Sequence, residues 1–293
     1  MFATLLGSLP RPSLADDADP EAVLDAVLEL QVEQGLEPLT DGGWPLDSSD
    51  PVAAWRSTAG RTDRLVKAVI DGPFTSGRPA AEVGALILGL ADAGCRWIEI
   101  NEPAATTIGT DPDAGARFAD AHRTLTAGLG PDVHLSLAIT GGNADQAGIE
   151  TILAGAYASL AIDLIDGPDN WRLATAAPAD RGLICGAVST RAGSDDGPEL
   201  LLWAAGYGAS TAGRGPARVG LATAGSLAAL PWDTAATKVR RLGEAARLAA
   251  APMDERLAAV DPRAIDPRSA ALGRYVPKSS PRGANRDTKR PPD

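Results

Sequence analysis

Residues 91–104 read Ala-Asp-Ala-Gly-Cys-Arg-Trp-Ile-Glu-Ile-Asn-Glu-Pro-Ala, and the fold prediction starts from this stretch. The apolar residues of 80–94 favour a buried helix that ends at a glycine. The run 96–100 favours a short strand, and it ends in the polar pair 101–102 just before Pro103. The stretch therefore predicts a helix, a tight turn and a strand with polar side chains at its carboxyl end.

The same alternation of helical and strand patterns extends over most of the chain. Strand candidates separated by helical spans lie at residues 2–6, 36–40, 65–70, 96–100, 133–139, 159–165, 182–188 and 218–222. Strands that alternate with helices imply right-handed βαβ units and a parallel sheet. Such units in about 250 residues fit a closed (β/α)8 TIM barrel. An open doubly wound sheet is the alternative, but residues 6–10 after the first strand match neither G-x-G-x-x-G nor a Walker loop.

The composition excludes several classes of protein. The chain has 293 residues and a formal net charge of −11, so we expect no nucleic-acid partner, because binding to phosphate backbones requires clustered Lys and Arg. Two cysteines cannot form a disulfide framework or a four-Cys zinc site, and we expect Cys95 and Cys185 to be buried. The sequence shows neither an apolar run of ~18 residues nor a signal-peptide pattern, so we expect no membrane partner and a cytoplasmic location.

Two regions of different character predict the domain organisation. Residues 1–275 carry the strand and helix patterns, so they are expected to form a single barrel domain. Residues 276–293 are rich in Pro, Ser and Arg with almost no apolar content. A segment that buries so little apolar surface does not offset its ordering entropy, so we expect a disordered basic tail.

Polar residues follow the predicted strands, and the carboxyl ends of parallel strands meet at one face. The residues at or near these ends are Ser8, Asp41, Asp71, Asn101, Glu102, Asp163, Asp166 and Arg191. For Asp71 and Asp166, each before Gly-Pro, a turn-forming role is the favoured interpretation. For Asn101 and Glu102 a functional role is favoured.

Three further residues have competing interpretations. Trp44 follows a Gly-Gly turn and could stack on a flat substrate ring or simply line the mouth of the barrel. Arg191 could meet an anionic group or pair with Asp195 or Asp196. His122 lies in the helical span 113–129, far from any strand end, so we expect it on the surface.

Residues 91–104 resemble the A-G-C-x-x-I-Q-I-D-E-P-A signature of the catalytic (C-terminal) domain of cobalamin-independent methionine synthase. Other segments resemble the motifs of that family in the right order. Residues 6–11 resemble its opening I-G-S-F-P, 34–43 its G-L-D-x-x-x-x-G-E turn, 71–75 its G-P-x-T strand end and 188–191 its H-S-P-R segment. The resemblance implies a barrel of the type shared with uroporphyrinogen decarboxylase. It also implies a methyltransferase of methionine biosynthesis that transfers a methyl group from a folate to a small thiol such as homocysteine.

The resemblance also implies a zinc ion, which this family holds with His-x-Cys, a Glu and a second Cys so that the substrate sulfur is kept as a thiolate. In this chain His134-Leu-Ser136 stands at the His-x-Cys position, Asp163 near the Glu, and Ala224 at the last Cys. Both cysteine ligands are therefore replaced, which makes the chain a divergent member. His134 and Asp163 remain as an incomplete metal site, with His134 also a candidate catalytic residue.

The resemblance assigns substrate contacts as well. Gly7 and Ser8 match the turn that holds the amino-acid carboxylate, while Gly43 and Asn101 stand where the family has carboxylates for the amino group. Glu102, together with Asp41, could compensate for the lost charge.

Three hypotheses follow from these matches. The first is a methionine synthase-like methyltransferase. The second is a zinc-free lyase or decarboxylase with Asp41 and Glu102 as acid and base. The third is a binding paralogue without catalysis, which could pair with an active subunit. In each case the expected partner is a small molecule, and the sequence leaves a homo-oligomer open.

Overall fold

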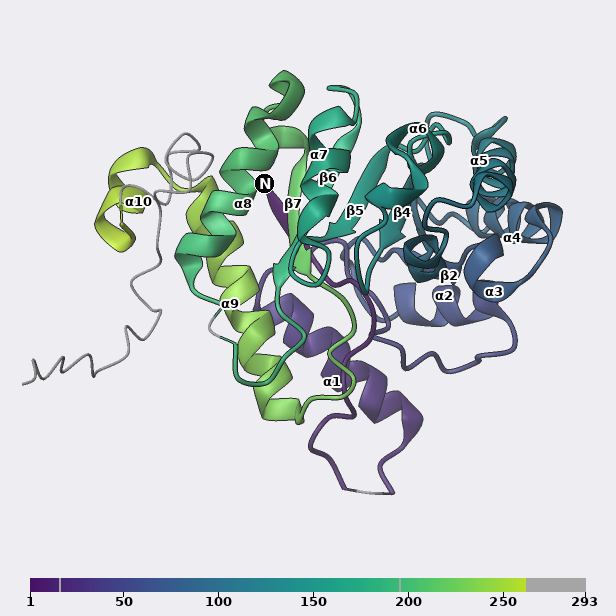
Figure 1. The fold of residues 1–293 in the computed structure, drawn as a ribbon. Helices are drawn as coiled ribbons and strands as arrows, with labels where there is room; N and C mark the ends of the chain where they lie inside the picture. The colour runs from purple at the N-terminus through teal and green to yellow at the C-terminus, as the bar shows by residue number, and fades with distance from the viewer. Residues whose placement is uncertain (16, 195, 262–293) are drawn as a thin grey trace, which may run out of the picture.

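The computed structural model describes residues 1–15, 17–194 and 196–261, so the predicted tail at 276–293 and the end of the predicted domain at 262–275 lie outside the described residues. The core of the fold is a seven-stranded parallel sheet in the order β1-β7-β6-β5-β4-β3-β2 (Figure 1). The strands are β1 (Phe2–Thr4), β2 (Ala68–Asp71), β3 (Trp97–Asn101), β4 (His134–Ile139), β5 (Ser159–Asp163), β6 (Gly182–Val188) and β7 (Val219–Thr223). The predicted α/β class and parallel sheet are confirmed.

Helices cover the outer face of this sheet (Figure 1). They are α1 (Pro20–Glu33), α2 (Pro51–Ala59), α3 (Pro73–Ser76), α4 (Ala80–Asp92), α5 (Pro112–Thr126), α6 (Ile149–Ile152), α7 (Trp171–Ala176), α8 (Pro198–Ser210), α9 (Trp232–Ala250) and α10 (Met253–Ala259). Three of them begin with proline just after an aspartate, and the carboxylates of Asp19, Asp50 and Asp111 accept from N–H groups of the first turn. Among the described helices, none is both long and apolar enough to cross a bilayer.

Alternate residues of most strands supply two separate apolar layers. Ile98 and Ile100 of β3 belong to the large core between sheet and helices. Side chains on the other face of the strands pack inside the curl of the sheet, and this smaller cluster consists of Leu6, Ala138, Ala161, Ile184 and Ala222, with Phe2 and Trp97 against it. A sheet with apolar residues on both faces is typical of parallel α/β proteins. Cys95 and Cys185 are free and fully buried, as predicted.

The segment predicted as the second strand, residues 36–40, is irregular. Its ladder contact is the single parallel bridge between Leu39 and Val66. The N–H of Glu37 donates to Ala3 O of β1 at 2.8 Å, and on the other side the N–H of Lys67 donates to Leu39 O at 2.9 Å. The segment thus connects β1 with the residues just before β2, the two strands at the ends of the sheet order. Eight regular strands were expected and the described residues contain seven.

Two features of the sequence explain why this segment does not form a regular strand. Pro38 has no N–H to donate to a ladder. Gly42 and Gly43 follow it with φ of 63° and 83°, which turns the chain away from β2 before pairing can continue. The segment 36–40 is therefore bound to β1 and to the residues before β2 by a few hydrogen bonds, without a regular ladder.

A buried ion pair lies beside this junction. Lys67 Nζ donates to Glu99 Oε2 at 2.6 Å and to Leu5 O at 2.8 Å, and the two charged side chains are 0% and 1% exposed. Burial lowers the pKa of Lys67, and the neighbouring Glu99 carboxylate opposes that shift. The pair connects the end of β1, the start of β2 and the middle of β3 inside the curled sheet.

We predict that Lys67→Met lowers the free energy of unfolding by about 3–5 kcal/mol, because it leaves the Glu99 carboxylate buried without its counter-charge. The double variant Lys67→Met/Glu99→Met removes both charges and should be clearly more stable than the single variant. Urea denaturation of the three proteins checks this. Arg78→Met, which removes a half-exposed ion pair with Glu82, is the control and should change stability little. A single variant as stable as the parent protein would contradict the proposed importance of the pair.

Candidate active site

The turn after β1 packs against two other loops at the carboxyl edge of the sheet. Gly7 has φ of 77°, and a Cβ there would lie 2.6 Å from Ser226 N, so only glycine fits. A Cβ on Gly43 would lie 2.4 Å from Ser8 Oγ, which shows how closely the turn 41–44 approaches Ser8. The predicted substrate contacts Gly7 and Ser8 therefore lie at the carboxyl edge, next to the Asp41 turn.

Trp44, the aromatic residue of this turn, forms a hydrogen bond to the backbone through its indole nitrogen. Trp44 donates its indole N–H to Leu9 O at 3.1 Å, and the guanidinium of Arg11 lies 6.0 Å from the centre of its ring. These contacts hold Trp44 against the first loop. A stacking role of Trp44 toward substrate stays a prediction.

Asn101 and Asp71 form a polar pair at the ends of two neighbouring strands. Asn101 Nδ2 donates to Asp71 Oδ1 at 2.9 Å, and the register pairs these two residues as the last of β3 and β2. The pair presents an amide and a carboxylate at the same edge as Ser8.

Glu102 does not join this group. It is 0% exposed, its Oε1 accepts from Phe74 N at 2.9 Å, and its Oε2 accepts from the N–H and hydroxyl of Thr75 at 2.9 and 2.7 Å. His122 Nε2 lies 3.3 Å from Glu102 Oε1. These contacts give Glu102 a structural role, and its predicted catalytic and substrate-binding role stays a prediction. Successive strand residues point to opposite faces, and Glu102 points outward where Asn101 points inward.

The prediction that His122 lies on the surface is wrong, because the residue lies in the core. It is 0% exposed on α5, and its Nδ1 lies 2.5 Å from the hydroxyl of Tyr157. Burial and the nearby Glu102 carboxylate raise the pKa of Tyr157 well above its ordinary value. His122 is thus hydrogen-bonded to Tyr157 and lies beside the buried Glu102 carboxylate, between the loop after β3 and the residues before β5.

His134 lies at the opposite end of the sheet from the predicted site. It is the first residue of β4, and five residue steps place it about 16 Å from the carboxyl end of that strand. Its Nε2 is 2.8 Å from Ser159 Oγ, and its ring packs on Trp97 with 3.8 Å between centroids. Burial lowers its pKa to about 4, with the positive charge of Lys67 as the second cause. The predicted catalytic role of His134 at the rim is therefore corrected.

Asp163, the predicted metal partner of His134, is the last residue of β5. Its carboxylate accepts hydrogen bonds from backbone N–H groups of the turn that follows. Its Oδ1 accepts from the N–H groups of Ile165 and Asp166 at 2.8 and 2.9 Å, and its Oδ2 from Gly141 at 3.1 Å. Burial raises its pKa, and these hydrogen bonds act in the opposite direction. The structure separates Asp163 from His134 by the length of a strand, so the two do not form a metal site.

Zinc does not fit the residues that the structure describes. Within the described ranges, no group of three His, Cys, Asp or Glu side chains is placed to hold a metal ion. The carboxyl ends of β4 and β7 present Thr140 and Ala224, neither of which supplies a thiolate or imidazole. The zinc that the resemblance implies therefore has no ligand set among the described residues.

Arg191 pairs with Asp166 and not with Asp196. The guanidinium is 73% exposed and contacts the Asp166 carboxylate, which joins the loops after β6 and β5. Asp196 instead contacts Lys238, and Asp195 lies outside the described residues. An anion-binding role of Arg191 stays a prediction.

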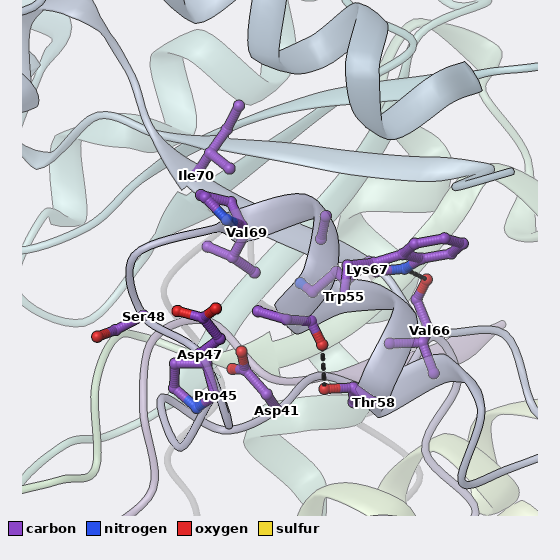
Figure 2. Close-up of a pocket in the computed structure, with 13 residues that line it drawn as sticks. Asp41, Pro45, Asp47, Ser48, Trp55, Thr58, Val66, Lys67, Val69 and Ile70 are labelled. Atoms are coloured by element: carbon purple, nitrogen blue, oxygen red, sulfur yellow. Dashed lines mark hydrogen bonds between the residues drawn. The ribbon is translucent and has the colours of Figure 1, made fainter. Parts of the chain in front are cut away.

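A cavity of about 180 Å³ opens where the chain turns away from β2. Its lining residues come from the turn after Thr40, from α2 and from β2 (Figure 2), and they include Asp41, Pro45, Asp47, Trp55, Lys67 and Val69. Trp55 donates its indole N–H to Val66 O at 3.1 Å, which fixes α2 against the start of β2. Burial raises the pKa of Asp41, and the hydrogen bond from Gly43 N at 2.8 Å acts against that shift. The cavity thus brings a protonatable carboxyl to a half-open, partly apolar space.

The sequence interpretation found Asp41 but missed the cavity that contains it. The sequence feature that points to this region is Lys67. A single lysine within the apolar run 65–70 indicates a buried, paired charge. Trp55 lies outside the predicted strands, so the strand pattern does not predict its contact with Val66 just before β2.

The chain shares its fold with solved methionine synthase-like proteins. A B12-independent methionine synthase from Shewanella sp. W3-18-1, in complex with selenomethionine, superimposes with a TM-score of 0.69 over 87% of this chain and 98% of that one, at 13% identity. A Listeria monocytogenes protein described as a vitamin-B12 independent methionine synthase gives 0.65 over 84% and 97%, at 14% identity. A methyltransferase from Methanosarcina mazei gives 0.53 over 83% and 93%, also at 14% identity. No protein-family model and no curated protein matches the sequence.

We predict that Glu102→Ala lowers the free energy of unfolding by about 3 kcal/mol or more, because the N–H groups of Phe74 and Thr75 and the Thr75 hydroxyl lose their acceptor. Glu102→Gln keeps an acceptor oxygen and should lose less. Thermal and urea denaturation measure both, with the exposed Glu82→Ala as the control. Normal stability of Glu102→Ala, combined with abolished activity, would instead identify Glu102 as catalytic.

Proposed function

We propose that this chain is a methyltransferase that binds a small acceptor in the Asp41 cavity and works without zinc. The observation that carries the proposal is the cavity itself, which places a half-buried carboxyl with a raised pKa at the carboxyl edge of the sheet. The likeness in fold to methionine synthase-like proteins supports methyl transfer as the reaction class, and chemistry in such folds lies at this edge.

The proposed acceptor is a small thiol such as homocysteine, with a methylated folate as donor. A cavity of about 180 Å³ suits an acceptor of that size and leaves the donor to approach from the open edge. Gly7, Ser8, Asn101 and Asp71 lie at the same edge and are the proposed contacts for the polar end of the acceptor.

Without zinc, the thiol must lose its proton to a protein base. We assign that role to Asp41, whose raised pKa makes it a better base than an ordinary aspartate. The thiol S–H bond breaks toward the Asp41 carboxylate, the S–CH3 bond forms as the donor N–CH3 bond breaks, and the proton returns from Asp41 to the donor nitrogen. Atoms and charge then balance without a metal.

The closed barrel is part of the same proposal. The hydrogen bonds of residues 36–40 to Ala3 on one side and to residues 65 and 67 on the other support this segment as the eighth, irregular member of a ring. The cavity is then the gap that this irregular member leaves beside β2.

A zinc-free lyase or decarboxylase at the same cavity is the second candidate, and the raised pKa of Asp41 is the observation that favours it. It differs from the first in needing no methyl donor. The small-molecule partner and the cytoplasmic location stay predictions from the sequence.

We predict that the purified protein converts homocysteine and methyl-tetrahydrofolate to methionine at a rate that excess chelator does not change. Asp41→Asn should lower that rate about 100-fold or more, because it removes the base. Mass spectrometry of the product measures both. Asp63→Asn, a surface change outside the cavity, is the control. Loss of activity with chelator would refute the zinc-free mechanism, and conversion of substrate without a methyl donor would favour the lyase.

We also predict a pH profile with one acidic limb. Asp41 acts as carboxylate, so the rate should fall as pH falls through its pKa, which lies above the ordinary 3.8 because of burial. The residual activity of Asp41→Asn should lack this limb. A profile for Asp41→Asn that still shows the limb would assign it to another group.

A further inference from the structure

A second cavity lies at the opposite, amino end of the sheet. Its volume is about 450 Å³, within the range of small-molecule pockets. Four of its lining residues are the first residues of consecutive strands, Trp97 of β3, His134 of β4, Ser159 of β5 and Gly182 of β6. None of its lining residues belongs to the Asp41 cavity, so the two are separate sites.

The inside of this cavity is largely aromatic and apolar. The rings of Phe2 and Trp97 meet edge to face at 5.6 Å, and His134 packs on Trp97 at 3.8 Å between centroids. Leu183 and Ile184 contribute further apolar lining. The hydrogen bond between His134 and Ser159 fixes the orientation of the imidazole. Such a lining favours a flat apolar group, because ring pairs add to the free energy of burial.

The mouth carries one charge of each sign. Asp180 and Arg218 both line the cavity and are exposed. Arg218 Nη1 lies 3.5 Å from the carbonyl of Ala179, so the guanidinium is beside the residue that precedes Asp180. In the part of the chain that the structure describes, neither side chain forms an ion pair within 4.0 Å. An ammonium and a carboxylate on one ligand would complement these two charges.

We propose that this amino-end cavity binds an aromatic α-amino acid. The ring enters among Phe2, Trp97 and His134, the carboxylate meets Arg218, and the ammonium meets Asp180. The site is distinct from the proposed catalytic one, so it stands whether or not the Asp41 cavity transfers methyl groups.

Isothermal titration calorimetry with L-phenylalanine tests the proposal on the full chain. One saturable site is expected. Phenylethylamine, which lacks the carboxylate, and 3-phenylpropionate, which lacks the ammonium, should each bind at least tenfold more weakly. Ala217→Trp places an indole at the exposed mouth and should abolish binding, while Ala81→Trp on α4 is the matched control and should bind normally.

Two charge variants make the test specific. Arg218→Gln should weaken L-phenylalanine at least tenfold and leave phenylethylamine unchanged, while Asp180→Asn should weaken L-phenylalanine and leave 3-phenylpropionate unchanged. Asp41→Asn should bind as the parent does. Absence of saturable binding, or normal binding by Ala217→Trp, would overturn the site. Binding that both charge variants retain at full strength would overturn the amino-acid class.

Discussion

The arrangement of the sheet depends on the buried contact between Lys67 and Glu99. Lys67 also donates to Leu5 O, so one ammonium group connects the residue after β1, the residue before β2 and the middle of β3, next to the irregular segment 36–40. A charge removed from water is tolerated only when it is paired and hydrogen-bonded, and this pair meets that condition. Because ladder hydrogen bonds are scarce beside it, the ion pair holds the edge of the cavity that contains Asp41.

A second buried network fixes the other side of the carboxyl edge. Glu102 accepts hydrogen bonds from N–H groups at the start of α3, and the His122–Tyr157 hydrogen bond lies beside its carboxylate. Glu102 does not line the cavity, whose carboxylates are those of Asp41 and Asp47. Glu102 therefore shapes the loop after β2, while Asn101 of the same segment lies at the carboxyl edge beside Asp71.

The alternating pattern was sufficient to predict the parallel sheet, the helices around it and the placement of Ser8, Asp41 and Asn101 at one edge. Strand alternation also contained the information that Glu102 points away from Asn101, since neighbouring strand residues face opposite sides. The motif match predicts His134 at the carboxyl edge. Its position near the start of the strand run 133–139 instead indicates the opposite end of the sheet. The single bridge at Leu39 and the contact between Trp55 and Val66 depend on tertiary packing, which no local pattern reports.

The irregular segment 36–40 and the turn that follows it have an evolutionary consequence. Cavity walls made of regular strands change only when sheet pairing changes with them, whereas the stretch from Asp41 to Pro51 has no ladder to preserve. Insertions, deletions and substitutions there alter the size and polarity of the pocket at little risk to folding. Changes confined to this one loop can therefore alter substrate specificity while the sheet and helices stay the same.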